Sequence, residues 1–227
     1  SAVYQGFTGS FALSVTIQPL PDIPMAARAY VAMNYASLGG IVARWPDSDS
    51  AHPIRIWADP GIRGLGILDN GRAWWKSRLP NVWTSVVEDS TAANLRIFLV
   101  NDSGASEICG GVGQTIDGTT YAILDAVIYV FNRPDCIGGN DRGLNVLIHE
   151  LGHAFGMFAH TLGCVDYMGF PCFRDSDSPT LLGWASWAYD PAVQPGTLIP
   201  VALLAPRLWH DVTSNDVELK FPIKIKQ

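Results

Sequence analysis

Apolar and polar side chains alternate at residues 53–59, and the largely apolar segment 95–100 is expected to form a second strand. A period of two is typical of strands that bury one face. The strongly apolar run 121–131 suits a buried or edge strand, and 11–17 is expected to form a further strand that stops before Pro19. These segments predict a β-sheet.

A buried helix is expected after the last of these strands. Apolar side chains recur there at the i, i+3, i+4, i+7 and i+11 spacing of a helix with one buried face: Leu144, Leu147, Ile148, Leu151 and Phe155. Asn140 or Asp141 is the N-cap candidate. Gly156 follows the stripe and is expected to end the helix and turn the chain back.

Three other helices are expected, at 24–38, 70–78 and 178–189. The second ends before a proline, and the third opens on a Ser-Pro pair. Tryptophans of the last two helices are expected to pack in the core, in preference to lining a substrate pocket: Trp74, Trp75, Trp184 and Trp187.

The central elements follow one another as β-α-β-β-α, which predicts an α+β fold with a twisted mixed β-sheet and two backing helices. The segments 201–209 and 218–226 fit a strand or a helix equally well. At 227 residues and 48% hydrophobic composition, the chain can bury a full core. We expect one domain, 1–227, with an N-terminal lobe to about residue 156 and a C-terminal lobe from about 157.

Candidate chemistry is concentrated in residues 149–160, which read His-Glu-Leu-Gly-His-Ala-Phe-Gly-Met-Phe-Ala-His. His149 and His153 stand one helical turn apart, so both imidazoles project from one face and can bind the same metal ion. They lie on or beside the buried stripe, where an unpaired imidazole would be costly. Glu150 stands next to the first histidine, where a carboxylate can take a proton from water activated by the metal.

This stretch resembles the signature of the metzincin metallopeptidases, H-E-x-x-H-x-x-G-x-x-H followed by a methionine turn, and the resemblance covers roughly residues 53–190. It implies that His160 is the third zinc ligand, although Ala159 stands at the family's position and the histidine comes one residue later. It implies that Met168, at the spacing of matrixin-type members, forms the methionine turn beneath the metal. Phe170 stands where some members carry a tyrosine ligand, so no tyrosine ligand is expected there.

The resemblance implies a zinc-dependent endopeptidase with one catalytic Zn²⁺. Three protein ligands leave one zinc position open, as in catalytic rather than structural sites. Glu150 would act as general base and pass the proton to the leaving amine. A protein or peptide substrate would bind along the edge of the sheet as an added strand.

Three alternatives stay open. The substrate could be glycosylated protein rather than plain peptide. Asp166 could replace His160 as the third ligand, although zinc prefers imidazole to a single carboxylate. A non-catalytic binding module could keep zinc for stability alone, but such a site has no use for the carboxylate of Glu150.

The charge and the termini indicate a small secreted enzyme. A net charge of −6 without clusters of lysine and arginine argues against nucleic acid or an anionic membrane as partners. No apolar run approaches the ~18 residues of a membrane-spanning helix. The protein is expected to be a monomer. The chain begins with serine, which is consistent with removal of a leader or propeptide.

Four cysteines permit three pairings, and an even number in loops around this motif favours two disulfides and an extracellular location. Cys164 with Cys172 would bracket the methionine turn. Cys109 with Cys136 would close the segment that leads into the metal helix.

The remaining polar residues have simpler explanations. His52 and His210 are expected to be surface or hydrogen-bonded histidines. Four loop aspartates could bind Ca²⁺, but the chain has no spaced ligand loop, so ordinary turns are the simpler account: Asp102, Asp117, Asp135 and Asp141.

Overall fold

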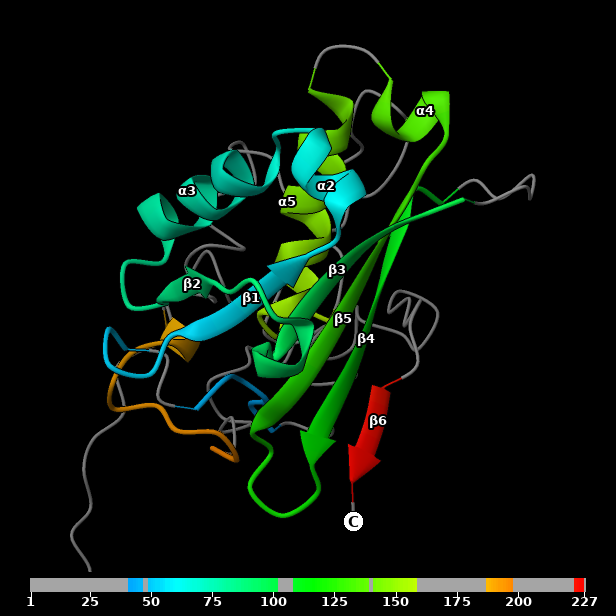
Figure 1. The fold of residues 1–227 in the computed structure, drawn as a ribbon. Helices are drawn as coiled ribbons and strands as arrows, with labels where there is room; N and C mark the ends of the chain where they lie inside the picture. The colour runs from blue at the N-terminus through cyan, green and yellow to red at the C-terminus, as the bar shows by residue number, and fades with distance from the viewer. Residues whose placement is uncertain are drawn as a thin grey trace, which may run out of the picture.

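The computed structural model describes residues 41–46, 49–101, 108–138, 141–158 and 187–197, together with the backbone of 223–226. These residues form a six-stranded sheet with helices packed on it, as Figure 1 shows. The predicted α+β class with a mixed sheet is confirmed. The elements expected at 11–17, 24–38 and 201–209, and most of the helix expected at 178–189, lie outside the described residues.

The strand order in the sheet is β2-β1-β3-β5-β4-β6. The strands are β1 (Ile54–Ala58), β2 (Thr84–Val86), β3 (Leu95–Val100), β4 (Gly110–Asp117), β5 (Ile123–Phe131) and β6 (Ile223–Lys226). Strands β2, β1, β3 and β5 run parallel, β4 is antiparallel to β5, and β6 is parallel to β4. The three central strands predicted from the pattern are confirmed as β1, β3 and β5, whereas β2 and β4 were not predicted.

Two helices back the sheet, as the sequence predicts. They are α3 (Leu68–Arg78) and α5 (Arg142–Ala154), and the shorter helices are α2 (Pro60–Gly64), α4 (Pro134–Ile137) and the 3-10 turn η2 (Ser90–Ala92). Helix α5 packs on β4 and β5, and α3 packs against α5. The helices approach closely at Gly71, because a Cβ atom there would lie 3.2 Å from the Leu147 side chain.

The apolar stripe of α5 lies in the core, as expected. Leu147 and Leu151 are fully buried, and Phe155 packs edge-on against the Trp75 ring with centroids 5.7 Å apart. The Trp75 indole nitrogen also donates to the carbonyl oxygen of Ile148 at 2.9 Å. Each large apolar side chain buried in this way stabilises the fold by about 1.5–3 kcal/mol. The stripe therefore fixes which face of α5 meets the sheet.

A segment ahead of β1, which the sequence did not place, is also part of the core. Residues 42–45 are buried, and the Arg44 guanidinium donates to the backbone oxygens of Ala188, Asp190 and Val193. The main chain of Val42 pairs with the same C-terminal stretch. Trp187 is buried there as well, which agrees with core packing for this tryptophan. Segments 42–45 and 187–197, far apart in the sequence, thus meet beside α5.

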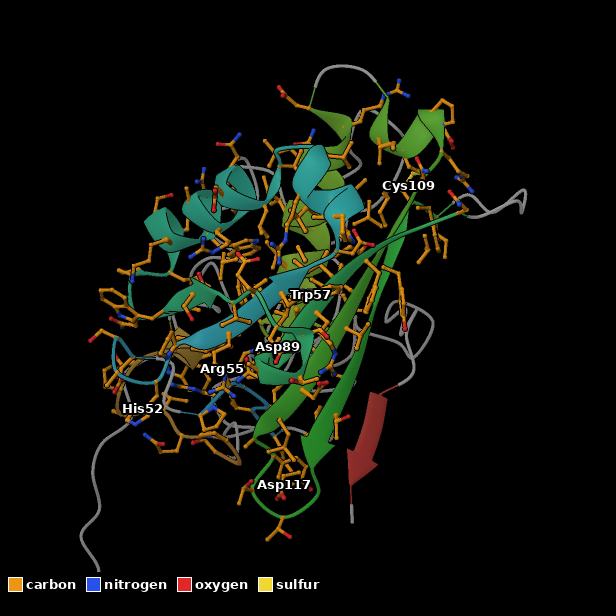
Figure 2. The ribbon with its side chains drawn as sticks, in the orientation of Figure 1. His52, Arg55, Trp57, Asp89, Cys109 and Asp117 are labelled. Carbon is orange, nitrogen blue, oxygen red and sulfur yellow. A yellow bond between two sulfur atoms is a disulfide. The ribbon has the colours of Figure 1, made fainter. Side chains whose placement is uncertain are left out.

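Two of the loop aspartates serve in turns. The Asp117 carboxylate, at the β4–β5 turn labelled in Figure 2, accepts hydrogen bonds from the backbone nitrogens of Thr119 and Thr120. Asp141 occupies the N-cap position of α5 with a left-handed φ of 61°, and its side chain makes no capping hydrogen bond. Within the described ranges, no helix is long and apolar enough to cross a membrane.

Candidate metal site on helix α5

The imidazoles of His149 and His153 face each other from successive turns of α5. Their Nε2 atoms lie 3.1 Å apart, and the ring planes are inclined at 78°. Two imidazole nitrogens on one tetrahedral zinc ion, each about 2.0–2.1 Å from it, are about 3.3–3.4 Å apart. The observed pair is therefore within a few tenths of an ångström of the spacing that a shared zinc ion requires.

The second ring nitrogen of His153 fixes which nitrogen can act as ligand. Its Nδ1 atom lies 2.5 Å from the backbone oxygen of Met157. A carbonyl oxygen only accepts hydrogen bonds, so Nδ1 must carry the proton and Nε2 of a neutral ring keeps its lone pair. Metal-binding histidines are commonly oriented by such a bond. This Nε2 atom is the one that lies 3.1 Å from Nε2 of His149.

Glu150 lies between the two histidines in sequence and is buried against the sheet. Its side chain is only 4% exposed. It passes over β4 at Gly110, where a Cβ atom would stand 2.6 Å from Oε1 of Glu150. A carboxylate is costly to bury without a polar or charged environment. The carboxylate belongs to the same helix as the two imidazoles.

The C-terminal end of α5 is closed by Gly156, as predicted. Gly156 has a left-handed φ of 91°, its N–H donates to the carbonyl of His153, and the N–H of Met157 donates to that of Gly152. These two bonds form a Schellman motif, which glycine favours because it has no Cβ atom. A Cβ atom on Gly156 would also stand 2.5 Å from the Ala43 oxygen. The glycine thus sets the turn that brings the Met157 oxygen to His153.

Side chains from distant parts of the chain hold the backbone of this helix end. Gln114 donates to the His153 oxygen at 2.7 Å, the Trp45 indole to the Ala154 oxygen at 2.8 Å, and the Tyr189 hydroxyl to the Phe155 oxygen at 2.9 Å. Burial raises the pKa of Tyr189 well above its ordinary value, so the phenol stays protonated and donates. The sequence prediction missed these three donors: Gln114, Trp45 and Tyr189. In the sequence, each of these residues shows only a polar group at the end of its side chain, and no local pattern indicates that the fold buries it.

Cys109 and Cys136 form a disulfide with their Cα atoms 5.1 Å apart, which confirms this predicted pairing. Cys109 precedes β4 beside α4, as Figure 2 shows. Asp135 stands close enough to both sulfurs for the three side chains to form a metal-sized group. Sulfurs bonded to each other offer no thiolate, however, and the Asp135 carboxylate accepts a hydrogen bond from Arg133. We therefore assign this group a structural role.

The other predicted site residues lie outside the described residues. These are the third-ligand candidates His160 and Asp166, the turn residue Met168, and the second cysteine pair, Cys164 and Cys172. His210 also lies outside, whereas His52 is exposed and lies 3.2 Å from the carboxylate of Asp49. Of the predicted metal-binding and catalytic residues, the structure describes His149, Glu150 and His153 on α5, and it brings the imidazoles of the two histidines together.

Comparison of the sequence with models of known protein families and with curated proteins finds no match. The assignment of this site therefore depends on its residues and their geometry.

Proposed function

We propose that this protein is a secreted, zinc-dependent endopeptidase of metzincin type. The observation that carries the proposal is the facing pair of Nε2 atoms of His149 and His153, 3.1 Å apart, on the helix that also presents Glu150. Uncharged imidazole nitrogens are common zinc ligands. The hydrogen bond from His153 to Met157 leaves the correct nitrogen available for a metal.

The residues of α5 would divide the work between binding and proton transfer. His149 and His153 hold the zinc, and His160 completes the ligand set that the motif implies. A zinc ion in such a site lowers the pKa of water toward ~7 and polarises the carbonyl that is attacked. Glu150 takes the proton from the attacking water and passes it to the leaving amine.

The edge of β4 nearest Glu150 is the proposed place for the peptide. The C-terminal strand β6 pairs with β4 from Gln114 to Asp117 (Figure 1). Among the residues that the structure describes, the other half of that edge, 110–113, has no strand partner. A substrate segment in extended conformation could add there by main-chain hydrogen bonds. This half of β4 is also the one that contacts Glu150.

The disulfide between Cys109 and Cys136 supports the secreted location, because disulfides persist in oxidising compartments. The same observation fits an endopeptidase that acts outside the cell, where glutathione and thioredoxin do not keep cysteines reduced.

The test of this function compares wild type with Glu150→Ala and, as a matched control, Glu88→Ala. Glu88 is exposed and pairs only with Arg63 in the described part of the chain. We expect Glu150→Ala to keep its zinc and to lose casein-cleaving activity by roughly 10²–10⁴-fold, the usual contribution of a general base. Glu88→Ala should cleave like wild type. Full activity with bound zinc in Glu150→Ala would refute the mechanism.

His160→Ala separates the remaining readings of the site. We expect it to lose zinc and activity together, because it removes one of three ligands. Normal zinc binding in His160→Ala would make Asp166 the better third ligand. Zinc-loaded wild type that cleaves a glycosylated protein but not casein would indicate the glycan-dependent alternative. Zinc-loaded wild type that cleaves neither would indicate a binding module.

A further inference from the structure

Strand β4 comes very close to helix α5 at Gly110, which contacts Glu150. A Cβ atom added to Gly110 would lie 2.6 Å from Oε1 of Glu150 and 2.9 Å from both its Cδ and Cγ atoms. Carbon atoms in contact normally stand about 3.5–4.0 Å apart. The volume that a side chain at position 110 would need is therefore already occupied by Glu150.

Glu150 has little room to yield. Its side chain is almost fully buried, and the Cγ atom, close to the helix backbone, cannot swing away as the end of a long exposed side chain could. The backbone of α5 next to it is anchored as well, because the Trp75 indole donates to the Ile148 oxygen and Gln114 donates to the His153 oxygen. The helix side of the contact is thus fixed.

Gly110 is equally constrained. The residue before it, Cys109, is joined to Cys136 by the disulfide, and its carbonyl accepts a hydrogen bond from Phe131 at 3.0 Å. Gly110 itself pairs with Val130 in the β4–β5 ladder. The strand side of the contact is therefore held on one flank by a covalent bond and on the other by the sheet.

The same disulfide links the strand to the start of the helix. Cys136 lies in α4, and the neighbouring Ile137 backbone stands 3.7 Å from the place where a Cβ atom on Gly143, in the first turn of α5, would lie. Strand β4, helix α4 and helix α5 are consequently packed together, with the disulfide joining β4 to α4.

We propose that Gly110 is a positioning residue for Glu150: its missing side chain provides the space that the carboxylate occupies on the helix that carries His149 and His153. This inference deepens the proposed peptidase function and rests on it. In this role Gly110 touches no reacting atom and acts by fixing where the general base stands. A larger residue at this position would displace the carboxylate without altering the imidazoles.

Gly113 on the same strand offers a matched control. Nothing lies within 4 Å of the Cβ atom that alanine would add there. Side chains alternate between the two faces of a strand, so position 113 faces away from α5 while 110 faces it. Both substitutions add one methyl group to a glycine of β4, but only the change at 110 meets Glu150.

The first test measures steady-state cleavage of a fluorogenic peptide and the zinc content of wild type, Gly110→Ala and Gly113→Ala. We expect Gly110→Ala to retain zinc and KM while kcat falls by roughly 10–100-fold, since a displacement of about 1 Å at a reacting group can cost 10²-fold. Gly113→Ala should match wild type in zinc content. Because residues 110–113 form the proposed substrate edge, the control for kcat and KM is Glu88→Ala, whose side chain is exposed and pairs with Arg63. Wild-type kcat in Gly110→Ala would overturn the proposal.

The second test uses metal-free protein, so that its result does not depend on catalysis. Thermal unfolding is measured for Gly110→Ala, Glu150→Ala and the double variant, which form a double-mutant cycle. If the two side chains compete for one space, Gly110→Ala lowers Tm with glutamate at position 150 and lowers it much less with alanine there. Equal losses of Tm in both backgrounds would contradict the contact.

These two tests separate failure of the inference from failure of the proposed function. If Glu150→Ala keeps full activity, the peptidase mechanism fails, whatever Gly110→Ala does. If Glu150→Ala is inactive while Gly110→Ala keeps both wild-type kcat and additive Tm values, the mechanism stands and the positioning role is wrong.

Discussion

At the scale of single residues, the chemistry on α5 depends on which atoms hold the backbone of its last turn. Nε2 of His153 keeps its lone pair because the Met157 carbonyl oxygen accepts a hydrogen bond from Nδ1, the other ring nitrogen. Met157 is placed by the Gly156 turn, and the adjacent Phe155 oxygen is held by the hydroxyl of Tyr189. Removing one of these supporting groups should therefore lower the free energy of unfolding, although the group lies away from the imidazoles.

Tyr189→Phe tests this support. The change leaves the Phe155 carbonyl without its buried donor, so we expect the free energy of unfolding to fall by about 1–3 kcal/mol in urea titration. Tyr129→Phe is the control, because Tyr129 is exposed and its ring packs on Phe98. Equal stability of Tyr189→Phe and wild type would show that the hydroxyl does not support the helix end.

The same pair of proteins has an expected pH dependence. Because burial raises the pKa of Tyr189 in the folded state, the neutral phenol favours folding. That stability is fully present below the unfolded pKa of about 10 and is lost as the pH rises above it. Wild type should therefore lose more stability above pH ~10 than Tyr189→Phe does.

The sequence predicted that the two imidazoles share a helix face and that a glycine ends the helix, because both signals are local. His149, His153 and Gly156 belong to one helical spacing and one helix stop. Trp45 and Tyr189 could not be predicted in the same way. They reach carbonyls of α5 that are 109 and 34 residues away in the sequence, and no periodic pattern encodes such a contact.

At the scale of elements, strand β4 is the one that matters most for the site and the one that the pattern could not reveal. It begins Gly-Gly-Val-Gly, so most of its first positions carry no side chain to alternate between apolar and polar. The structure explains the composition at Gly110, where Glu150 occupies the space. Strands β1 and β3, which carry a side chain at every position, were predicted to within one residue.

The disulfide is the element-scale feature with the clearest energetic prediction. Cys109 and Cys136 are 27 residues apart, and closing a loop of that length in the unfolded chain corresponds to about 3–4 kcal/mol. We expect the Cys109→Ser/Cys136→Ser double variant to lose roughly this much unfolding free energy, measured by denaturant titration under non-reducing conditions.

The same variant should also be less active, because the bond fixes the residue before Gly110. Zinc content provides the control, since the histidines lie on α5 and do not depend on the sulfurs. Loss of zinc together with activity would indicate that the disulfide holds the metal site itself rather than the strand beside it.

At the scale of the whole molecule, segments far apart in the sequence converge on one helix. Residues 42–45 and 187–193 meet beside the end of α5, while β4 and α3 pack along its length. The sequence predicted an α+β class with two backing helices, which this arrangement confirms. It could not predict the strand order. Strands β1 and β2 pair although two helices lie between them in the sequence, and β3 pairs with β5 although β4 lies between them, so these pairings depend on contacts between distant segments.

Helix α5 buries a glutamate and a histidine at the centre of this arrangement. Burying a polar side chain costs free energy unless the side chain forms hydrogen bonds, pairs with a charge or binds a metal ion. A metal ion that binds only the folded chain stabilises the fold. The central claim is therefore that one zinc ion is held by His149 and His153.

The most direct measurement of that claim is zinc bound per chain after dialysis, for wild type, His149→Ala, His153→Ala and the exposed control His52→Ala. We predict about one zinc per chain in wild type and His52→Ala, and at least a tenfold weaker zinc affinity in each of the other two variants. Unchanged zinc binding in His149→Ala and His153→Ala, or absence of zinc from wild type, would contradict the account.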